Sequence, residues 1–406
     1  MRCLVPVILV FTILVSSFAE AAPQKLRFIW EPVPNAVRYQ FVVTRGDKAD
    51  APVVYADDFV YNNGYELRVF HEGLLDGNHF YRVCPLDAQG RAVGSFSEPW
   101  ALGAGEQDTT SPYPTSEPYA PGYALLYPVY SWVKTLEAAE YEVAVWYRNP
   151  KRRENDLIHL LYTDDITLYE YAGFTRPGSY FWRVRSLDEH KQPVGTWSEP
   201  VPFEVTTPTA VAAIGDGITH GGGAVVHGAD RPMYDWESYT GMPVKNLGHT
   251  GDTVEAMLER FDRDVPPFAP RVLIIMAGGE DYRRGTASGK IIEDLAELRD
   301  RSEEYGIIPV FLTLPPICPE AIARTGIGER PAYAWDSIRR EVNAWLLTQE
   351  YVVDVDSVLT DEKGLLRSEY TSDGVQIDTE GKRYIGGRVK EYLEITFPKL
   401  LRPADG

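Results

Sequence analysis

The stretch Val211-Ala212-Ala213-Ile214-Gly215-Asp216-Gly217-Ile218-Thr219 decides the fold of the second half of the chain. Its first four residues are apolar, and two glycines separated by an aspartate follow at once. A short apolar run that ends in such a turn is typical of a buried strand. We therefore expect a strand at 211–214 with a polar turn at its carboxyl end.

Short apolar runs and amphipathic segments of helix length alternate from this stretch onward. Strands are expected at 211–214, 244–247, 272–277, 307–314 and 351–355, and helices at 253–261, 290–305, 335–349 and 382–395. This alternation indicates a mainly parallel sheet with helices on both faces. Because ligands of such sheets bind beyond the carboxyl ends of the strands, the candidate site should lie in the loops that follow them.

Those loops carry recognisable blocks. Gly215 to Thr219 is similar to Gly-Asp-Ser-Ile-Thr, the first block of the SGNH hydrolases, the GDSL-type esterases. Asn246 to Thr253 matches their second block, Asn-x-Gly-x-x-Gly-x-Thr. Gly278 to Asp281 stands where the family has Gly-x-Asn-Asp, and Asp373 to Gln376 where it has Asp-Gly-x-His. The resemblance implies that residues 207–406 form a three-layer, flavodoxin-like α/β domain with a parallel five-stranded sheet.

The departures from the family pattern fall on the residues that carry its chemistry. In the family a serine attacks the ester, a histidine takes its proton, and an oxyanion hole stabilises the intermediate. Here Gly217 stands for the serine, Gln376 for the histidine and Glu280 for the oxyanion-hole asparagine, while Gly248 and Asp373 are kept. An amide accepts no proton near neutral pH, and a carboxylate repels a developing oxyanion. The resemblance therefore implies a site with no intact catalytic set.

We expect the binding cleft to be formed by the residues of these blocks. The candidates are Asp216, Gly217, Thr219, Gly248, His249, Glu280, Asp281, Asp373 and Gln376. Two alternatives stay open: His220 or His249 serving as a replacement base, and the carboxylates forming an acid–base pair or recruiting calcium. The simpler interpretation is that these side chains cap loops and helices. We predict no resident metal and no cofactor.

The first half of the chain contains an internal repeat. Trp30 to Val43 aligns with Trp132 to Val145, and Phe80 to Val83 with Phe181 to Val184. Alternation of apolar and polar residues within each copy is typical of half-buried antiparallel strands. The copies resemble fibronectin type III domains and predict two all-β sandwiches at 23–106 and 118–206, joined by a Pro/Tyr-rich linker at 107–117. They serve either as spacers or as surfaces that bind a glycan through exposed aromatic rings.

Residues 1–22 are typical of an export signal. Arg2 is followed by an apolar run at 4–15 and by the small-x-small site Ala19-Glu20-Ala21. A single membrane anchor is the alternative, but the run is short and no basic cluster follows it. After cleavage no membrane-spanning segment is expected, and the protein is predicted to be secreted or periplasmic. The remaining thiols, Cys84 and Cys318, fall in different domains, so we expect no structural disulfide between them.

Charge narrows the function classes further. The 406 residues hold 40 Lys+Arg and 59 Asp+Glu, for a formal net charge of -19, and this excess repels phosphate backbones, so nucleic acid is not an expected partner. The sequence predicts an exported, catalytically inactive SGNH homologue that binds an extracellular glycan or an acylated small molecule. The alternatives are an active carbohydrate O-acyl esterase with a non-standard constellation, and a structural or adhesive surface protein.

Overall fold

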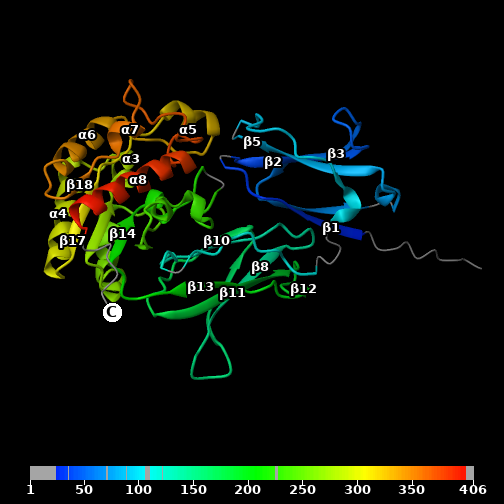
Figure 1. Ribbon diagram of the computed structural model, residues 1–406, viewed down its shortest axis with the longest axis horizontal. Coiled ribbons are helices and arrows are strands. Elements are labelled where there is room, and N and C mark those ends of the chain that lie inside the picture. Colours follow the sequence, from blue (N-terminus) through cyan, green and yellow to red (C-terminus); the bar gives the residue numbers. More distant parts are fainter. Residues whose placement is uncertain are drawn as a thin grey trace, which may run out of the picture.

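The chain folds into two β-sandwiches followed by an α/β domain (Figure 1). The computed structural model describes residues 24–34, 36–69, 72–87, 89–105, 110–120, 122–224 and 227–398. The predicted export signal at 1–22 lies outside these residues. No helix in the described part of the chain is long and apolar enough to cross a membrane.

The first sandwich pairs a two-stranded sheet with a four-stranded one. Its elements are β1 (Gln24–Ile29), β2 (Arg38–Arg45), β3 (Val53–Val60), β4 (Gly64–Val69), η1 (Glu72–Leu75), β5 (His79–Leu86), β6 (Trp100–Ala101) and η2 (Leu102–Ala104). Strand β1 pairs with β4, and the other sheet has the order β3-β2-β5-β6. Phe28, Phe41 and Tyr81 stack between the two sheets, so alternate residues of the strands supply the core.

The second sandwich repeats this arrangement. Its strands are β7 (Val129–Ser131), β8 (Glu140–Tyr147), β9 (Asp156–Thr163), β10 (Thr167–Tyr169), β11 (Gly178–Leu187), β12 (Pro193–Val194) and β13 (Val201–Val205). Strand β7 pairs with β10, and β9, β8 and β11 are neighbours as β3, β2 and β5 are. The internal repeat is thus a repeat of strand order, and the two all-β units are confirmed. The fibronectin type III likeness itself stays a prediction.

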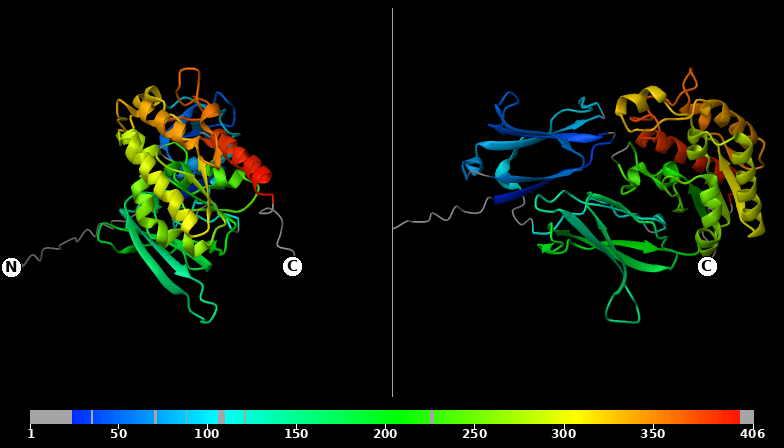
Figure 2. Two further views of the ribbon diagram at one scale, coloured as in Figure 1. Left: turned by 90° about the vertical axis from the view of Figure 1, so that its left-hand side faces the viewer. Right: turned by 180° about the vertical axis from the view of Figure 1, so that it is seen from behind.

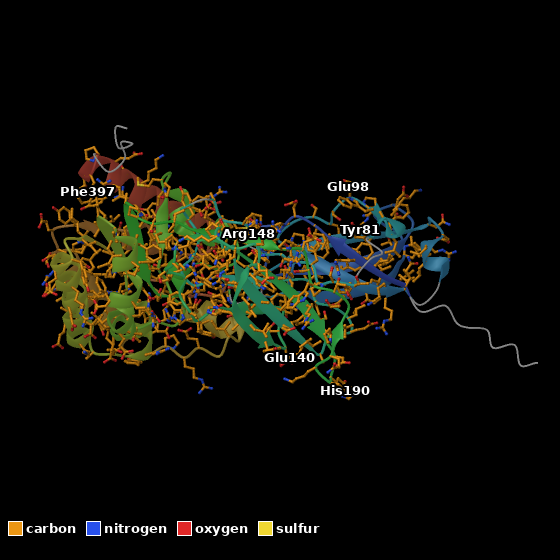
Figure 3. The ribbon with its side chains drawn as sticks, turned by 90° about the horizontal axis from the view of Figure 1, so that it is seen from below. Tyr81, Glu98, Glu140, Arg148, His190 and Phe397 are labelled. Atoms are coloured by element: carbon orange, nitrogen blue, oxygen red, sulfur yellow. The ribbon has the colours of Figure 1, made fainter. Side chains whose placement is uncertain are left out.

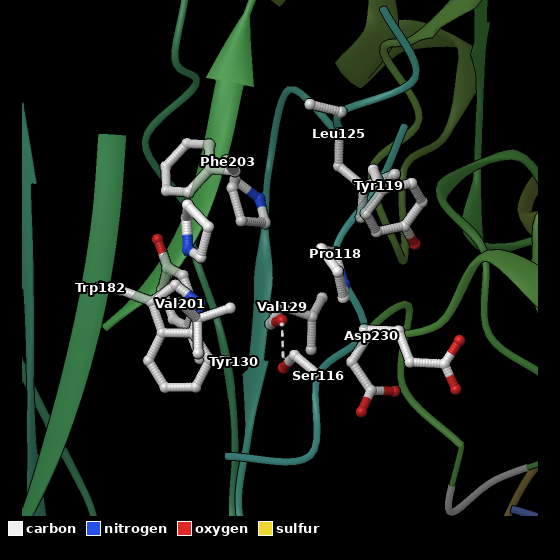
Figure 4. A pocket seen from close by; sticks show the side chains of 14 residues that line it. Ser116, Pro118, Tyr119, Leu125, Val129, Tyr130, Trp182, Val201, Phe203 and Asp230 are labelled. Carbon is white, nitrogen blue, oxygen red and sulfur yellow. Dashed lines mark hydrogen bonds between the residues drawn. The ribbon is translucent and has the colours of Figure 1, made fainter. Parts of the chain in front are cut away.

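The segment predicted as a linker is paired with the second sandwich. The amide of Thr115 donates to the carbonyl of Ser131 over 2.9 Å, and the Ser116 hydroxyl donates to the carbonyl of Val129 over 3.2 Å (Figure 4). Pro118 lines the same small pocket as Trp182 of β11. Extended, proline-rich backbone keeps the amides between its prolines, and these pair with the strand edge. Within the predicted linker 107–117, residues 113–116 therefore lie alongside β7 and the residues that follow it.

The α/β domain contains the predicted sheet. The sheet consists of five parallel strands: β14 (Val211–Gly215), β15 (Val244–Asn246), β16 (Val272–Met276), β17 (Ile308–Leu312) and β18 (Val352–Val353). Their order in the sheet is β15-β14-β16-β17-β18. Its helices are α1 (Gly217–His220), α2 (Val254–Asp264), α3 (Gly279–Arg284), α4 (Ser288–Glu304), α5 (Pro319–Thr325), α6 (Trp335–Leu346), α7 (Asp356–Leu359) and α8 (Thr379–Thr396), with 3-10 turns η3 (Pro232–Tyr234), η4 (Trp236–Tyr239) and η5 (Pro266–Phe268). The predicted α/β class is confirmed.

Helices cover both faces of this sheet. Ile214 packs into the core that includes Met257 of α2, whereas Ala213 packs into a second core that includes Ile385 of α8. All five residues of β14 are buried, because each face of the strand meets a helical layer. Burial of both faces of β14 explains why residues 211–214 form a continuous apolar run in the sequence.

The second sandwich lies against both other units (Figures 1 and 2). The amide of Leu126 donates to the carbonyl of Asn246 over 2.9 Å, which joins it to the α/β domain. The amide of Leu136 donates to Glu66 over 3.2 Å, which joins it to the first sandwich. Figure 3 shows Arg148 of the second sandwich between Phe397 of the α/β domain and Tyr81 of the first sandwich in that view. The second sandwich is therefore packed against both of its neighbours.

Candidate functional site

The turn after β14 is held by its own aspartate. Asp216 caps the short helix α1, and its carboxylate accepts the amide of Ile218 over 3.0 Å. The side chain is buried, and this burial raises the pKa of Asp216, against the opposing effect of the Arg283 guanidinium. Asp216 therefore shapes the turn from inside the domain.

Gly217 faces Gln376 across the site. A Cβ atom added at Gly217 would lie 3.3 Å from Nε2 of Gln376 and 3.7 Å from Cγ2 of Thr250. The backbone at Gly217 is not left-handed, so a serine could occupy the position with a small shift of the glutamine amide. The structure thus brings together the two positions where the resemblance puts a nucleophile and its base, although neither reacting group is present.

Asp373 holds the turn that carries Gln376. One carboxylate oxygen accepts the amides of Val375 and Gln376, each over 2.8 Å, and the side chain is buried. The side-chain oxygen Oε1 of Gln376 is buried and has no hydrogen-bond partner among the described residues. The turn therefore fixes the backbone of Gln376, while the oxygen of its side-chain amide receives no hydrogen bond from the described residues.

Gly248 allows the second loop to lie directly on the first. A Cβ atom there would come within 2.2 Å of the backbone nitrogen of His220, so only glycine fits. The amide of Gly248 donates to Oδ1 of Asn246 over 2.9 Å, and Nδ2 of Asn246 donates to the carbonyl of Thr219 over 2.6 Å. Asn246 thus fastens the two loops together, a role that its place at the start of the second block does not reveal.

Glu280 is neutralised by arginines of its own helix. Its carboxylate contacts the guanidinium of Arg283 and lies 2.6 Å from Nη2 of Arg284. Arg283 also lies 2.5 Å from Glu329. The acid that stands for the oxyanion-hole asparagine is therefore tied into an ion-pair network. The spacing of three and four residues along a helix was the sequence signal for these pairs.

Asp281 caps a neighbouring helix. Its carboxylate accepts the amide of Val254, the first residue of α2, over 2.9 Å. Burial raises the pKa of Asp281 to about 6. Among the described residues, no group of three or more His, Cys, Asp or Glu is arranged to hold a metal ion. The carboxylates of the blocks are thus placed by hydrogen bonds and arginines.

His220 is fixed between the two domains. Its Nδ1 accepts the amide of Thr250 over 3.1 Å and lies 2.9 Å from the Thr250 hydroxyl, which assigns the ring proton to Nε2. Nε2 then donates to the carbonyl of Tyr127 over 2.7 Å. Burial lowers the pKa of His220 to about 4, so the ring is neutral at physiological pH.

The second sandwich also reaches the rim of the site. Nδ1 of His249 donates a hydrogen bond to Asp252 over 2.8 Å, and the ring lies edge-on to the rings of Tyr127 and Tyr171 at 4.7 and 5.9 Å. Tyr171 is 78% exposed beside His249, and Thr250 is exposed beside the Gly217 Cβ position. Tyr171 belongs to a loop of the second sandwich, and its placement here could not be read from the sequence.

The region that contains this site matches a known protein family. The GDSL-like Lipase/Acylhydrolase family matches residues 213–384. This region is a GDSL-like lipase/acylhydrolase domain. No curated protein matches the chain.

Solved structures of the family resemble the GDSL-like domain at low sequence identity. A GDSL-like lipase from Bacteroides thetaiotaomicron is 20% identical over 46% of this chain and 88% of its own, with a TM-score of 0.37. A lipase/acylhydrolase from Enterococcus faecalis is 20% identical over 45% and 95%, with a TM-score of 0.35. An acetyl xylan esterase from Geobacillus stearothermophilus is 21% identical over 48% and 97%, with a TM-score of 0.34.

The GDSL-like domain places the candidate residues in two groups. His249, Glu280 and Gln376 are partly exposed, and the ring of His249 lies against that of Tyr171. The interior group is Asp216, Gly217, Thr219, Gly248, Asp281 and Asp373, each of which is buried. The expectation that the block residues line a cleft stays a prediction. The side chain of Thr219, at 0% exposure, presents no surface to a ligand in this structure.

Proposed function

We propose that the GDSL-like domain recognises an extracellular glycan or an acylated small molecule without hydrolysing an ester. The observation that carries this proposal is the approach of the Gly217 Cβ position to within 3.3 Å of Gln376 Nε2. The spacing suits a nucleophile and a base, yet the two residues supply neither. A family site that keeps its shape and lacks its reacting groups is suited to binding alone.

The chemistry of the remaining groups supports this conclusion. The Gln376 amide accepts no proton at neutral pH, and the Glu280 carboxylate is paired with arginines instead of offering a donor to an oxyanion. Hydrolases that lose their triad retain roughly 10³ to 10⁴-fold catalysis over water, and this remaining activity depends on an intact oxyanion hole. With nucleophile, base and one oxyanion donor replaced together, ester hydrolysis has no efficient route through the family positions.

The exposed rim supports retention of binding. Tyr171 offers an aromatic ring to solvent beside His249, and an aromatic face suits the apolar C–H surface of a sugar ring. Gln376 is partly exposed, and a side-chain amide can hydrogen-bond a ligand as donor or acceptor. Export to the periplasm or the cell exterior, where such ligands occur, is proposed from the sequence of residues 1–22 alone.

The first test is hydrolysis of 4-nitrophenyl acetate by the mature protein. We expect the natural protein and Asp373→Ala to stay at background, and the triple variant Gly217→Ser, Gln376→His and Glu280→Asn to gain activity. The matched control is the same triple variant carrying Asp373→Ala, which should lose the gain. Hydrolysis by the natural protein that Asp373→Ala abolishes would make the proposal wrong.

Binding is tested separately, by thermal shift against soluble oligosaccharides with and without O-acetyl groups. A saturable shift that Tyr171→Ala removes is expected. Tyr333→Ala is the control, because Tyr333 is also fully exposed but lies in the loop between α5 and α6. A shift that both variants retain would place the ligand elsewhere.

One observation favours a second candidate, an esterase with a substitute nucleophile. The Thr250 hydroxyl lies 2.9 Å from His220 Nδ1 and 3.8 Å from the Gly217 Cβ position. The low pKa of His220 weakens it as a base, which is why this candidate ranks second. If the natural protein hydrolyses esters and Thr250→Val abolishes the activity while Asp373→Ala does not, this candidate replaces the first.

A further inference from the structure

The first sandwich is open along one side, where its two sheets do not close on each other. Small-molecule sites are cavities of roughly 300 to 1,000 Å³, and the cavity here measures ≈ 470 Å³. It lies between the edge strand β3 of one sheet and β4 of the other; Figure 1 shows β3 and β1, the partner of β4, on opposite sides of the sandwich. We refer to it as the sandwich cavity.

The walls of the sandwich cavity are aliphatic. Six side chains from β2, β3, β4, η1, η2 and the second sandwich line it: Val43, Val54, Leu67, Leu74, Leu102 and Leu136. Val43 and Leu102 are fully buried and form the inner wall, while Val54 and Leu136 are 48% and 40% exposed at the opening. Apolar surface of this kind disfavours water and gains from contact with a hydrocarbon.

The polar groups of the walls are already satisfied by the protein. The hydroxyls of Tyr55 and Tyr65 contact each other, and Tyr65 donates to Asp57 over 2.9 Å. Glu66 accepts hydrogen bonds from Arg27 over 2.8 Å and from the amide of Leu136 over 3.2 Å. A peptide would bring amides and carbonyls that need partners, whereas a hydrocarbon chain needs none. The walls therefore favour an alkyl chain over a peptide strand.

One rim of the sandwich cavity carries a surplus positive charge. Arg68 lines the cavity and pairs with Glu137 at 3.4 Å, and Lys25, its cross-strand partner, pairs with the same carboxylate at 3.1 Å. Two cations thus share one anion. A carboxylate at this rim would complete the charge balance and could accept two hydrogen bonds from the guanidinium.

We propose that the sandwich cavity binds a medium-chain or long-chain fatty acid, with its alkyl chain between the sheets and its carboxylate at Arg68. This site is separate from the GDSL-like domain and does not depend on the function proposed for it. Both sandwiches contribute to it, since Leu136 and Glu137 precede β8 of the second sandwich.

The test is an isothermal calorimetric titration of the mature protein with dodecanoate. Saturable binding at one site is expected, and Val54→Trp, which fills the opening, should weaken it at least tenfold. Val53→Trp is the matched control: Val53 is the neighbouring residue of β3, is 59% exposed and does not line the cavity. If Val54→Trp disturbs folding by circular dichroism, Leu136→Trp fills the opening from the second sandwich.

A second measurement tests the orientation of the ligand. Arg68→Gln should weaken binding of dodecanoate several-fold and leave binding of dodecanol unchanged. Absence of dodecanoate binding up to ~1 mM, an affinity of only about 4 kcal/mol, would overturn the proposal. Equal binding of dodecanoate by wild type, Val54→Trp and Leu136→Trp would also overturn it, because the ligand would then lie elsewhere. If Arg68→Gln weakened binding of the acid and of the alcohol equally, the role of Arg68 would be overturned.

Discussion

Nε2 of His220 lies 2.7 Å from the carbonyl oxygen of Tyr127, so the first loop of the GDSL-like domain is hydrogen-bonded to the second sandwich. The same ring accepts the amide of Thr250 at its other nitrogen. A neutral imidazole can make both bonds, because one nitrogen donates and the other accepts. Protonation would place a second N–H against the amide of Thr250, so the hydrogen bond at Nδ1 would be lost while Nε2 could still donate to Tyr127.

This arrangement predicts a specific pH dependence for His220. The folded pKa is about 4 and the usual value 6.5, so between these values only the unfolded state binds the proton. The contribution of His220 to the free energy of unfolding is therefore complete above pH 6.5. It falls by about 1.4 kcal/mol per pH unit as the pH drops, so that about 3 kcal/mol has been lost near pH 4.

The variant His220→Gln isolates this effect. Asp281 and Asp378, whose pKa values burial raises to about 6, titrate in the same range with the opposite sign, so the wild-type curve alone is not informative. We expect the stability advantage of wild type over His220→Gln, measured by urea unfolding, to be largest at pH 7.5 and to shrink steadily toward pH 4. A constant difference across this range would contradict the buried neutral ring.

Arg231 is predicted to hold the first sandwich against the GDSL-like domain. Its Nη2 donates to Oδ1 of Asn62 over 3.0 Å and to Oδ1 of Asn63 over 2.7 Å, and all three side chains are buried. Replacement by alanine removes the donor and leaves buried acceptors underused, at a cost on the order of 2 kcal/mol. We expect Arg231→Ala to lower the melting temperature and to raise the radius of gyration in X-ray scattering.

Arg271→Ala serves as the control for this variant. Arg271 is exposed, so its replacement should change stability by no more than about 0.5 kcal/mol and leave the scattering curve unchanged. An unchanged radius of gyration in Arg231→Ala would show that other contacts are sufficient to hold the first sandwich.

Two adjacent glycines of α8 should respond in opposite ways to alanine. A Cβ atom at Gly386 would lie 2.3 Å from the carbonyl oxygen of Trp236, whereas one at Gly387 meets nothing within 4 Å. Gly386→Ala forces apart α8 and η4, at a cost of roughly 1 to 3 kcal/mol, and Gly387→Ala gains about 0.5 to 1 kcal/mol of helix propensity. Thermal unfolding of both variants measures the difference, and equal melting temperatures would argue against the close approach of α8 to η4.

The strands and helices of the GDSL-like domain could be predicted because their signals are local. The run 211–214 is apolar since both faces of β14 are covered, and helix periodicity at 290–305 marks the buried stripe of α4. Short helices such as α3 and α5 were missed, because a few residues give too little periodicity to detect. The pairing of Thr115 with Ser131 could not be predicted for a different reason, since proline content does not say what an extended segment lies against.

The sequence by itself determined that glycine and glutamine stand at 217 and 376, where the family resemblance puts a nucleophile and a base, because residue identities need no coordinates. Only the tertiary structure decided what surrounds them: the arginines around Glu280, the enclosure of Thr219, and the approach of Tyr171 from another domain. Identity and periodicity are properties of a residue and its near neighbours along the chain. Burial, pairing and the docking of one domain on another depend on contacts between distant segments, which the fold alone brings together.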